Sequence, residues 1–160
     1  GNADSRACIR LSGADVVIGG EITKPLNDSL GFIGARSNVK GFLCEYMTSG
    51  RVIVLGDPGP WMCAGMTGGI LYLRLQPHLN FDQAAIQRRL AKGAKVVVQE
   101  VGEKDLKNIR ELLTTYADEL KQNHQAEDSQ KALSLLVDWQ NTFVRIVPIG
   151  QQEEQRFATE

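Results

Sequence analysis

Short apolar runs recur in the first half of the chain, and each run directly follows a glycine. The runs read ADVVIGG, FIGARS, RVIVLG and ILYLRL, and the glycines before them are Gly13, Gly31, Gly50 and Gly69. These glycines are spaced by 18, 19 and 19 residues. Repeats of about twenty residues are typical of solenoids in which each repeat makes one turn. Strands rich in Val, Ile and Leu, separated by glycine turns, predict a parallel β-helix of about four short rungs.

A second series of residues keeps step with these glycines. Cys8, Leu26, Cys44 and Cys63 are spaced by 18, 18 and 19 residues. Equivalent positions in stacked turns lie above one another, and cysteine packs as a small, buried hydrophobe. We therefore expect a structural ladder inside the coil. A metal site or a redox pair is the alternative, although no CxxC is present and both histidines lie outside the repeats.

The second half of the chain begins with a short helix and a strand. Asn80 can cap a helix that has Gln83 at its third position and ends before Gly93. The sequence KVVVQEV, residues 95–101, then predicts a strand that can pair with the solenoid.

Two amphipathic helices are predicted after Gly102, because the hydrophobic period changes to that of a helix. Apolar residues step at helical spacing in two series: Ile109, Leu112, Leu113, Tyr116, Leu120, and then Ala132, Leu135, Leu136, Trp139, Phe143. We expect the first helix to be capped near Gly102 and the second at Asp128 or Ser129. The short polar connection QNHQAED favours an antiparallel pair, and Pro148 is expected to end the second helix.

The predicted fold class is therefore mainly β with C-terminal helices. Residues 1–80 form the glycine-rich β-helix, and residues 81–149 form a helix-strand-helix-helix cap packed on it. Residues 150–160 are expected to be a flexible tail.

Composition narrows the classes of function. The chain has 160 residues, a formal net charge of −1 and three cysteines. This length suits one domain, and the balanced charge gives no indication of a nucleic-acid or lipid partner. No apolar stretch is long enough to span a membrane, and the N-terminus lacks the pattern of a signal peptide. We expect a cytoplasmic protein with reduced thiols.

Each segment that could carry chemistry has a structural explanation as well. The glycines of GDPGPWMCAGMTGG could cradle a phosphate, but neither GxxxxGK[ST] nor a GxGxxG that opens a helix is present, so turns are favoured for Gly59, Gly65 and Gly68. Glu45 beside Tyr46 could be an acid-base pair, yet such chemistry needs a base positioned by further polar groups.

Three aromatic side chains are interpreted in the same way. Trp61 and Trp139 are expected to pack rather than to form a ligand cage, and His78 after Pro77 is expected to mark a turn that leaves the coil.

Residues 41–73, GFLCEYMTSGRVIVLGDPGPWMCAGMTGGILYL, resemble the GXGXG segment in the C-terminal domain of the glutamate synthase large (alpha) subunit. That family typically has GDHGCEYMTGG, a Val-rich strand ending in Leu-Gly, then AAGMSGG and another strand. The endings are also similar, because SQKALSLLVDWQNTFVRIVP matches a family segment that closes on FVKVMP. The matched motif comprises Cys44, Glu45, Tyr46, Met47, Thr48, Gly50, Gly56, Gly65, Met66, Gly68 and Gly69.

The resemblance implies a right-handed parallel β-helix closed by helices. In that family the domain has no catalytic residues and communicates between an amidotransferase domain and a domain with FMN and an iron-sulfur cluster. It therefore implies no catalytic, cofactor-binding or metal-binding residue in this chain. FMN and iron-sulfur are expected only in partner domains or subunits.

The chain departs from the family in lacking a stretch like AGERFAVRNSG, which contributes further rungs. We therefore expect the N-terminal end of the coil to meet partner domains, upstream coils or a second copy. Two alternatives remain open. One is an independent small-molecule or nucleotide-binding enzyme that uses the glycine loops. The other is the related β-helix subunit of N-methylglutamate synthase or formylmethanofuran dehydrogenase.

Overall fold

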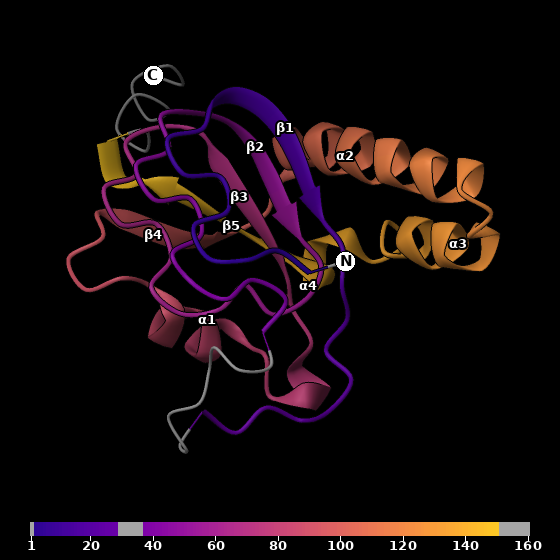
Figure 1. Cartoon of the computed structure of the whole chain (residues 1–160), viewed down its shortest axis with the longest axis horizontal. Coiled ribbons are helices and arrows are strands. Elements are labelled where there is room, and N and C mark those ends of the chain that lie inside the picture. The colour runs from indigo at the N-terminus through magenta and orange to yellow at the C-terminus, as the bar shows by residue number, and fades with distance from the viewer. Residues whose placement is uncertain (1, 29–36, 151–160) are drawn as a thin grey trace.

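The computed structural model describes residues 2–28 and 37–150, and within them one mixed sheet forms the centre of the molecule. Its five strands lie in the order β1-β2-β3-β5-β4 (Figure 1). The strands are β1 Ser12–Ile18, β2 Ser49–Val54, β3 Ile70–Arg74, β4 Val96–Glu100 and β5 Phe143–Pro148. The first three are parallel, whereas β5 is antiparallel to both β3 and β4.

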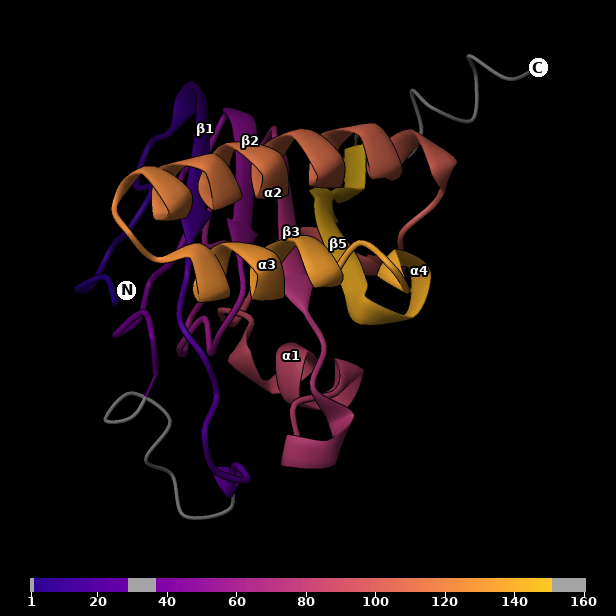
Figure 2. The same cartoon turned by 90° about the vertical axis from the view of Figure 1, so that its right-hand side faces the viewer.

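Both faces of the sheet are covered (Figures 1 and 2). The long helix α2 Glu103–Gln122 and the helix α3 Ala126–Ser134 lie side by side on one face, with the short α4 Trp139–Thr142 beside them. The other face is covered by the helix α1 Gln83–Arg89 and by three stacked turns, residues 6–11, 42–47 and 61–66, which we call the coil. A 3-10 helix, η2 Pro77–Leu79, precedes α1.

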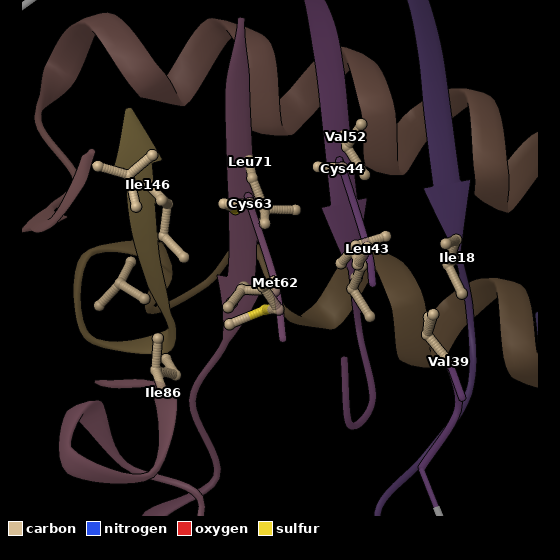
Figure 3. Close-up of a cluster of buried hydrophobic side chains, with 14 of the residues drawn as sticks. Ile18, Val39, Leu43, Cys44, Val52, Met62, Cys63, Leu71, Ile86 and Ile146 are labelled. Carbon is tan, nitrogen blue, oxygen red and sulfur yellow. The ribbon is translucent and has the colours of Figure 1, made fainter. Parts of the chain in front are cut away.

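Alternation along the strands divides the core into two layers. Val52, Val54 and Leu71 point into the layer beneath the coil, which also contains Cys44 and Cys63 (Figure 3). Their neighbours Ile53 and Tyr72 point the other way, against α2. This period of two is the reason that RVIVLG and ILYLRL form strands buried on both faces.

The expected four-rung register is wrong in one respect. β1 pairs directly with β2, with Ser12 opposite Ser49, so these two strands are neighbours in the sheet rather than the first and third rungs. Gly31 itself lies outside the described residues. The described residues thus establish three parallel strands within an open mixed sheet.

One expectation about a helix cap and one about a strand pairing also need correction. The short helix and the strand are confirmed as α1 and β4, but Asp82, not Asn80, caps α1, because its carboxylate accepts a hydrogen bond from Ala85 N–H at 2.9 Å. β4 pairs with β5 rather than with the coil.

The last predicted helix is the larger error. α2 begins after its N-cap Gly102 as expected, whereas α3 begins at Ala126 and ends at Ser134. The chain then turns through α4, and Phe143–Pro148 is a strand. Phe143 packs against α2 while Val144 and Ile146 pack beneath the coil, so this segment needs the two-sided burial that a strand provides.

Candidate functional site

Three turns of the coil share a backbone in which every second residue has a positive φ. The turns are residues 6–11, 42–47 and 61–66. Positive φ values between 52° and 66° occur at Arg6, Cys8, Arg10, Phe42, Cys44, Tyr46, Trp61, Cys63 and Gly65. Left-handed conformations are costly for residues other than glycine, so the surrounding contacts must hold these turns in place.

Hydrogen bonds stack each turn on the next. Cys44 N–H donates to the Ala7 carbonyl at 2.9 Å, and Cys63 N–H donates to the Leu43 carbonyl at 2.8 Å. The three cysteines therefore occupy equivalent positions on neighbouring turns, and Cys44 and Cys63 are fully buried in the core (Figure 3).

Leu26 does not stack with the three cysteines, contrary to the predicted four-residue ladder. The Cys44-to-Ala7 hydrogen bond joins the first two turns directly and leaves no turn between them. Leu26 instead belongs to the connection after β1, where its N–H donates to the Leu79 carbonyl at 2.9 Å.

The environment of the thiols is that of packing residues. Burial raises the pKa of Cys63 to about 12, and a hydrogen bond with Cys8, together with burial, raises the pKa of Cys44 well above its usual value. The hydrogen bond with Cys44 lowers the pKa of the half-buried Cys8. All three thiols are free, and the described residues contain no group of three or more His, Cys, Asp or Glu side chains able to hold a metal ion.

Several motif glycines allow close approach between turns. A Cβ at Gly68 would collide with the Thr48 carbonyl, and one at Gly56 would collide with the side chain of Asn38. Gly69 has φ +84°, and a Cβ there would meet the Met47 side chain and the Gly50 carbonyl. A Cβ at Gly50 would meet the backbone of Ala14, whereas a Cβ at Gly13, at φ +136°, would meet nothing within 4 Å.

The remaining motif residues build the turns. Met47 and Met66 are buried in the core, and Thr48 Oγ1 donates to the Leu11 carbonyl at 3.3 Å. Gly59, outside the matched motif, has φ +75° and lies against the Val39 carbonyl.

Glu45 and Tyr46 are not arranged as an acid-base pair. Tyr46 is 52% exposed, and its ring lies over Gly65, where a Cβ would collide with it. Within the described part of the chain, no side-chain hydrogen bond joins the Glu45 carboxylate to Tyr46 or to a group that could orient it.

The aromatic side chains also pack. Phe42 and Trp61 come from neighbouring turns and stack with their ring centroids 5.0 Å apart, and Arg6 lies 5.8 Å from the centroid of Phe42. Trp139 packs against the core beside α2, and His78 is exposed in η2.

A buried ion cluster is the feature that sequence reasoning missed. Arg89 at the end of α1 is fully buried and donates to both carboxylate oxygens of Asp57 at 3.0 Å and to those of Asp28 at 2.7 and 3.0 Å. Burial alone would raise the pKa of Asp28, but hydrogen bonds and charge from Arg89 and Arg88 outweigh it and hold that pKa below its usual value. In the sequence, Arg89 lies on the same face of the predicted helix as Ile86, and an arginine on an apolar helix face is a signal for a buried charge.

A second polar network joins the sheet to α2. Tyr72 Oη donates to Asp105 at 2.8 Å and accepts from Asn108 at 3.0 Å, and Arg145 lies 3.4 Å from Asp105. Asp105 also accepts from Gly102 N–H and so caps α2. These side chains join the sheet to α2, and they lie on the face of the sheet opposite the glycine turns.

Comparison with known proteins gives the family. Residues 35–149 match the GXGXG motif family. The glutamate synthase [NADPH] large chain of Bacillus subtilis is 32% identical over 168 aligned residues, covering 99% of this chain and 9% of the relative. The chloroplastic ferredoxin-dependent glutamate synthase of Spinacia oleracea is 32% identical over 118 residues, covering 69% of this chain and 6% of the relative. The ferredoxin-dependent glutamate synthase of Antithamnion sp. is 38% identical over 117 residues, covering 68% of this chain and 6% of the relative.

The chain therefore belongs to the GXGXG motif family, and its resemblance to glutamate synthase large chains is confirmed. It spans less than a tenth of the length of these relatives. None of the helices in residues 2–28 and 37–150 combines the length and the apolar character needed to cross a membrane.

Proposed function

We propose that this chain is a non-catalytic β-helix domain or subunit of a glutamate-synthase-like assembly. Its role is to hold apart, and to communicate between, an amidotransferase unit and a unit with FMN and an iron-sulfur cluster. The proposal is carried by one observation: the region that matches the GXGXG motif family, residues 35–149, contains two of the three stacked turns, residues 42–47 and 61–66. FMN and iron-sulfur are assigned to partners, and the location to the cytoplasm.

The use of the motif residues supports a structural role. Met47 and Met66 fill the core, and Gly56 and Gly68 allow neighbouring backbones to approach. Catalysis by a nucleophile or a base requires a second group within hydrogen-bond reach that activates it. The observed contacts of Glu45, Tyr46 and the three cysteines instead suit packing between turns.

The N-terminal edge of the sheet supports a partner. β1 is the edge strand and is largely exposed, so its outer backbone groups are available to another strand. The first turn, residues 6–11, lies at the same edge, because it stacks on the second turn through Arg6 and Arg10 N–H groups. We infer that a preceding coil, a partner subunit or a second copy covers this edge.

The isolated chain tests the non-catalytic role. We expect it to release no ammonia from glutamine and to retain no FMN after purification, measured by coupled ammonia detection and by flavin absorbance. Glutaminase activity that co-purifies with the folded chain, or stoichiometric FMN, would instead support the alternative of an independent enzyme. Glu45→Gln and Tyr46→Phe variants provide the control, because an activity that arises in these turns should fall in one of them, whereas a contaminant's activity should persist in both.

A further inference from the structure

A polar cavity lies where the three parallel strands end. It has a volume of about 460 Å³, within the usual range for small-molecule sites. Gly20 follows β1, Leu55 follows β2, and Arg74 is the last residue of β3, so each strand contributes to its floor. The helices α2 and α3 form its other wall, and Figure 2 shows α3 crossing in front of these strand ends. Ligands commonly bind outside the carboxyl ends of parallel strands.

Arg74 is a half-buried cation in this cavity, and in the described part of the chain it has no hydrogen bond or ion pair. Burial lowers the pKa of Arg74, and the charge of Glu21 opposes this only at a distance. The other inward arginines differ, since Arg51 pairs with Asp15 and Arg89 pairs with Asp57. A charge that is partly withdrawn from water gains from an anionic partner, so Arg74 is available to bind an anionic group that enters the cavity.

The rim of the cavity carries charges of both signs. Lys131 adds a second positive charge, whereas Glu21 and Asp128 are carboxylates. Asp128 is close enough to Tyr116 in the same cavity to raise its pKa, after the larger effect of burial. A simple anion would be attracted by Arg74 and repelled by both carboxylates. A ligand with a carboxylate and an ammonium group satisfies both parts of the site.

We propose that this cavity binds a small α-amino acid, with its carboxylate on Arg74 and its ammonium group toward Glu21 and Asp128. Guanidinium groups bind carboxylates through two parallel hydrogen bonds, which fixes the orientation of the ligand. The aliphatic wall formed by Leu55, Leu120 and Leu135 leaves room for an uncharged part of the side chain. This site is separate from the glycine turns and stands independently of the structural role proposed above.

The probes are glycine, L-glutamine and L-glutamate, titrated into the ¹⁵N-labelled 160-residue chain. We expect saturable amide shifts at residues 20–21, 55, 74 and 125–135 with at least one amino acid. Acetate and methylammonium each carry only one of the two charges, and we expect them to bind at least about tenfold more weakly. Affinity for acetate equal to that for every amino acid would overturn the proposal, as would no shift by any amino acid up to about 10 mM.

Two variants test the orientation. Arg74→Gln should weaken amino-acid binding by about tenfold or more, whereas Arg110→Gln, on the exposed face of α2, should leave it unchanged. Glu21→Gln, an exposed and therefore well-tolerated change, should weaken binding of the amino acid but not of acetate. Wild-type affinity in both Arg74→Gln and Glu21→Gln would contradict the assignment, provided that their melting temperatures match that of the wild type.

Discussion

At the scale of single residues, the left-handed positions show how the turns are held. Phe42, Cys44 and Tyr46 all have φ near +60°, a conformation that costs roughly 1–2 kcal/mol for each residue other than glycine. Their N–H groups all donate to neighbouring turns, so the stacked arrangement offsets a cost that an isolated turn could not sustain. Sequence spacing predicted that the cysteines would lie on equivalent positions, but no local signal indicated their backbone conformation.

The first prediction concerns Gly68. A Cβ there would collide with the backbone carbonyl of Thr48, which belongs to the neighbouring turn and cannot rotate away. We expect Gly68→Ala to lower the free energy of unfolding by about 2–4 kcal/mol, measured by urea denaturation. Gly150→Ala is the matched control, because a Cβ there meets nothing within 4 Å. Equal stability of the two variants would show that the turns do not pack as described.

The second prediction concerns the thiols. Burial raises the pKa of Cys63 to about 12, and the pKa of Cys44 is also raised, whereas that of the half-buried Cys8 is lowered. At pH 8 we expect iodoacetamide to modify Cys8 first, because the thiolate is the reactive form. Cys44 and Cys63 should react only at the rate of unfolding. Mass spectrometry of tryptic peptides gives the three rates, and rapid native modification of Cys63 would contradict its placement in the core.

At the scale of elements, the sequence predicted the strands better than the last helix. The run RVIVLG alternates between two buried layers, and its predicted strand is β2. Residues 132–143 follow a helical period, yet α3 stops at Ser134. The apolar residues of β5 lie close together and are buried on both faces, a pattern that periodicity alone cannot distinguish from a buried helix. The partner strands that decide the matter, β3 and β4, are distant in sequence.

The third prediction concerns α1, which Arg89 fastens to Asp28 and Asp57 in segments distant from it in sequence. Arg89→Met leaves the buried carboxylate of Asp57 without its counter-charge and leaves the half-buried Asp28 with Arg88 alone, so it should cost about 3–5 kcal/mol at pH 7, measured by urea denaturation. An Arg110→Met variant, changed at an exposed position, should be nearly neutral.

The pH dependence of this cluster has a defined sign. The folded-state pKa of Asp28 is lowered, so its contribution to stability is present above the unfolded value of about 4 and is lost as the pH falls through the folded value. Wild-type stability should therefore decline below about pH 4. In Arg89→Met, protonation of Asp28 removes a charge that has lost its main partner, so the difference in the free energy of unfolding between the variant and the wild type should narrow in acid. If the difference in the free energy of unfolding between Arg89→Met and the wild type stays constant from pH 7 to pH 3, the ion cluster is not formed.

At the scale of the whole molecule, the two edge strands of the sheet differ in exposure. β4, at one edge, has one buried and three partly buried residues among its five. β1, at the other edge, has four exposed residues among its seven, and it has no neighbour beyond β2 among the described residues. The sequence predicted both of these strands, but it could not show their relative exposure or which surface a partner covers.

The fourth prediction follows from that open edge. We expect the isolated chain to self-associate with rising concentration, measured by static light scattering, because exposed edge strands pair with other strands. Ala14→Lys, at an exposed position of β1, should reduce the association, whereas Thr115→Lys adds the same charge at an exposed position of α2 and serves as the matched control. A monomer at high concentration, with amides of residues 6–20 protected from exchange, would show that this edge needs no partner.

The composition of the assembly purified under native conditions tests the central claim most directly. Affinity purification through this chain, followed by native mass spectrometry and a glutamine-dependent glutamate assay, identifies its partners and their activity together. The structural-domain proposal predicts an amidotransferase unit and an FMN-containing unit in fixed stoichiometry with this chain, and glutamate formation by the assembly alone. A chain that purifies without either unit, or that itself forms glutamate from glutamine, would contradict it.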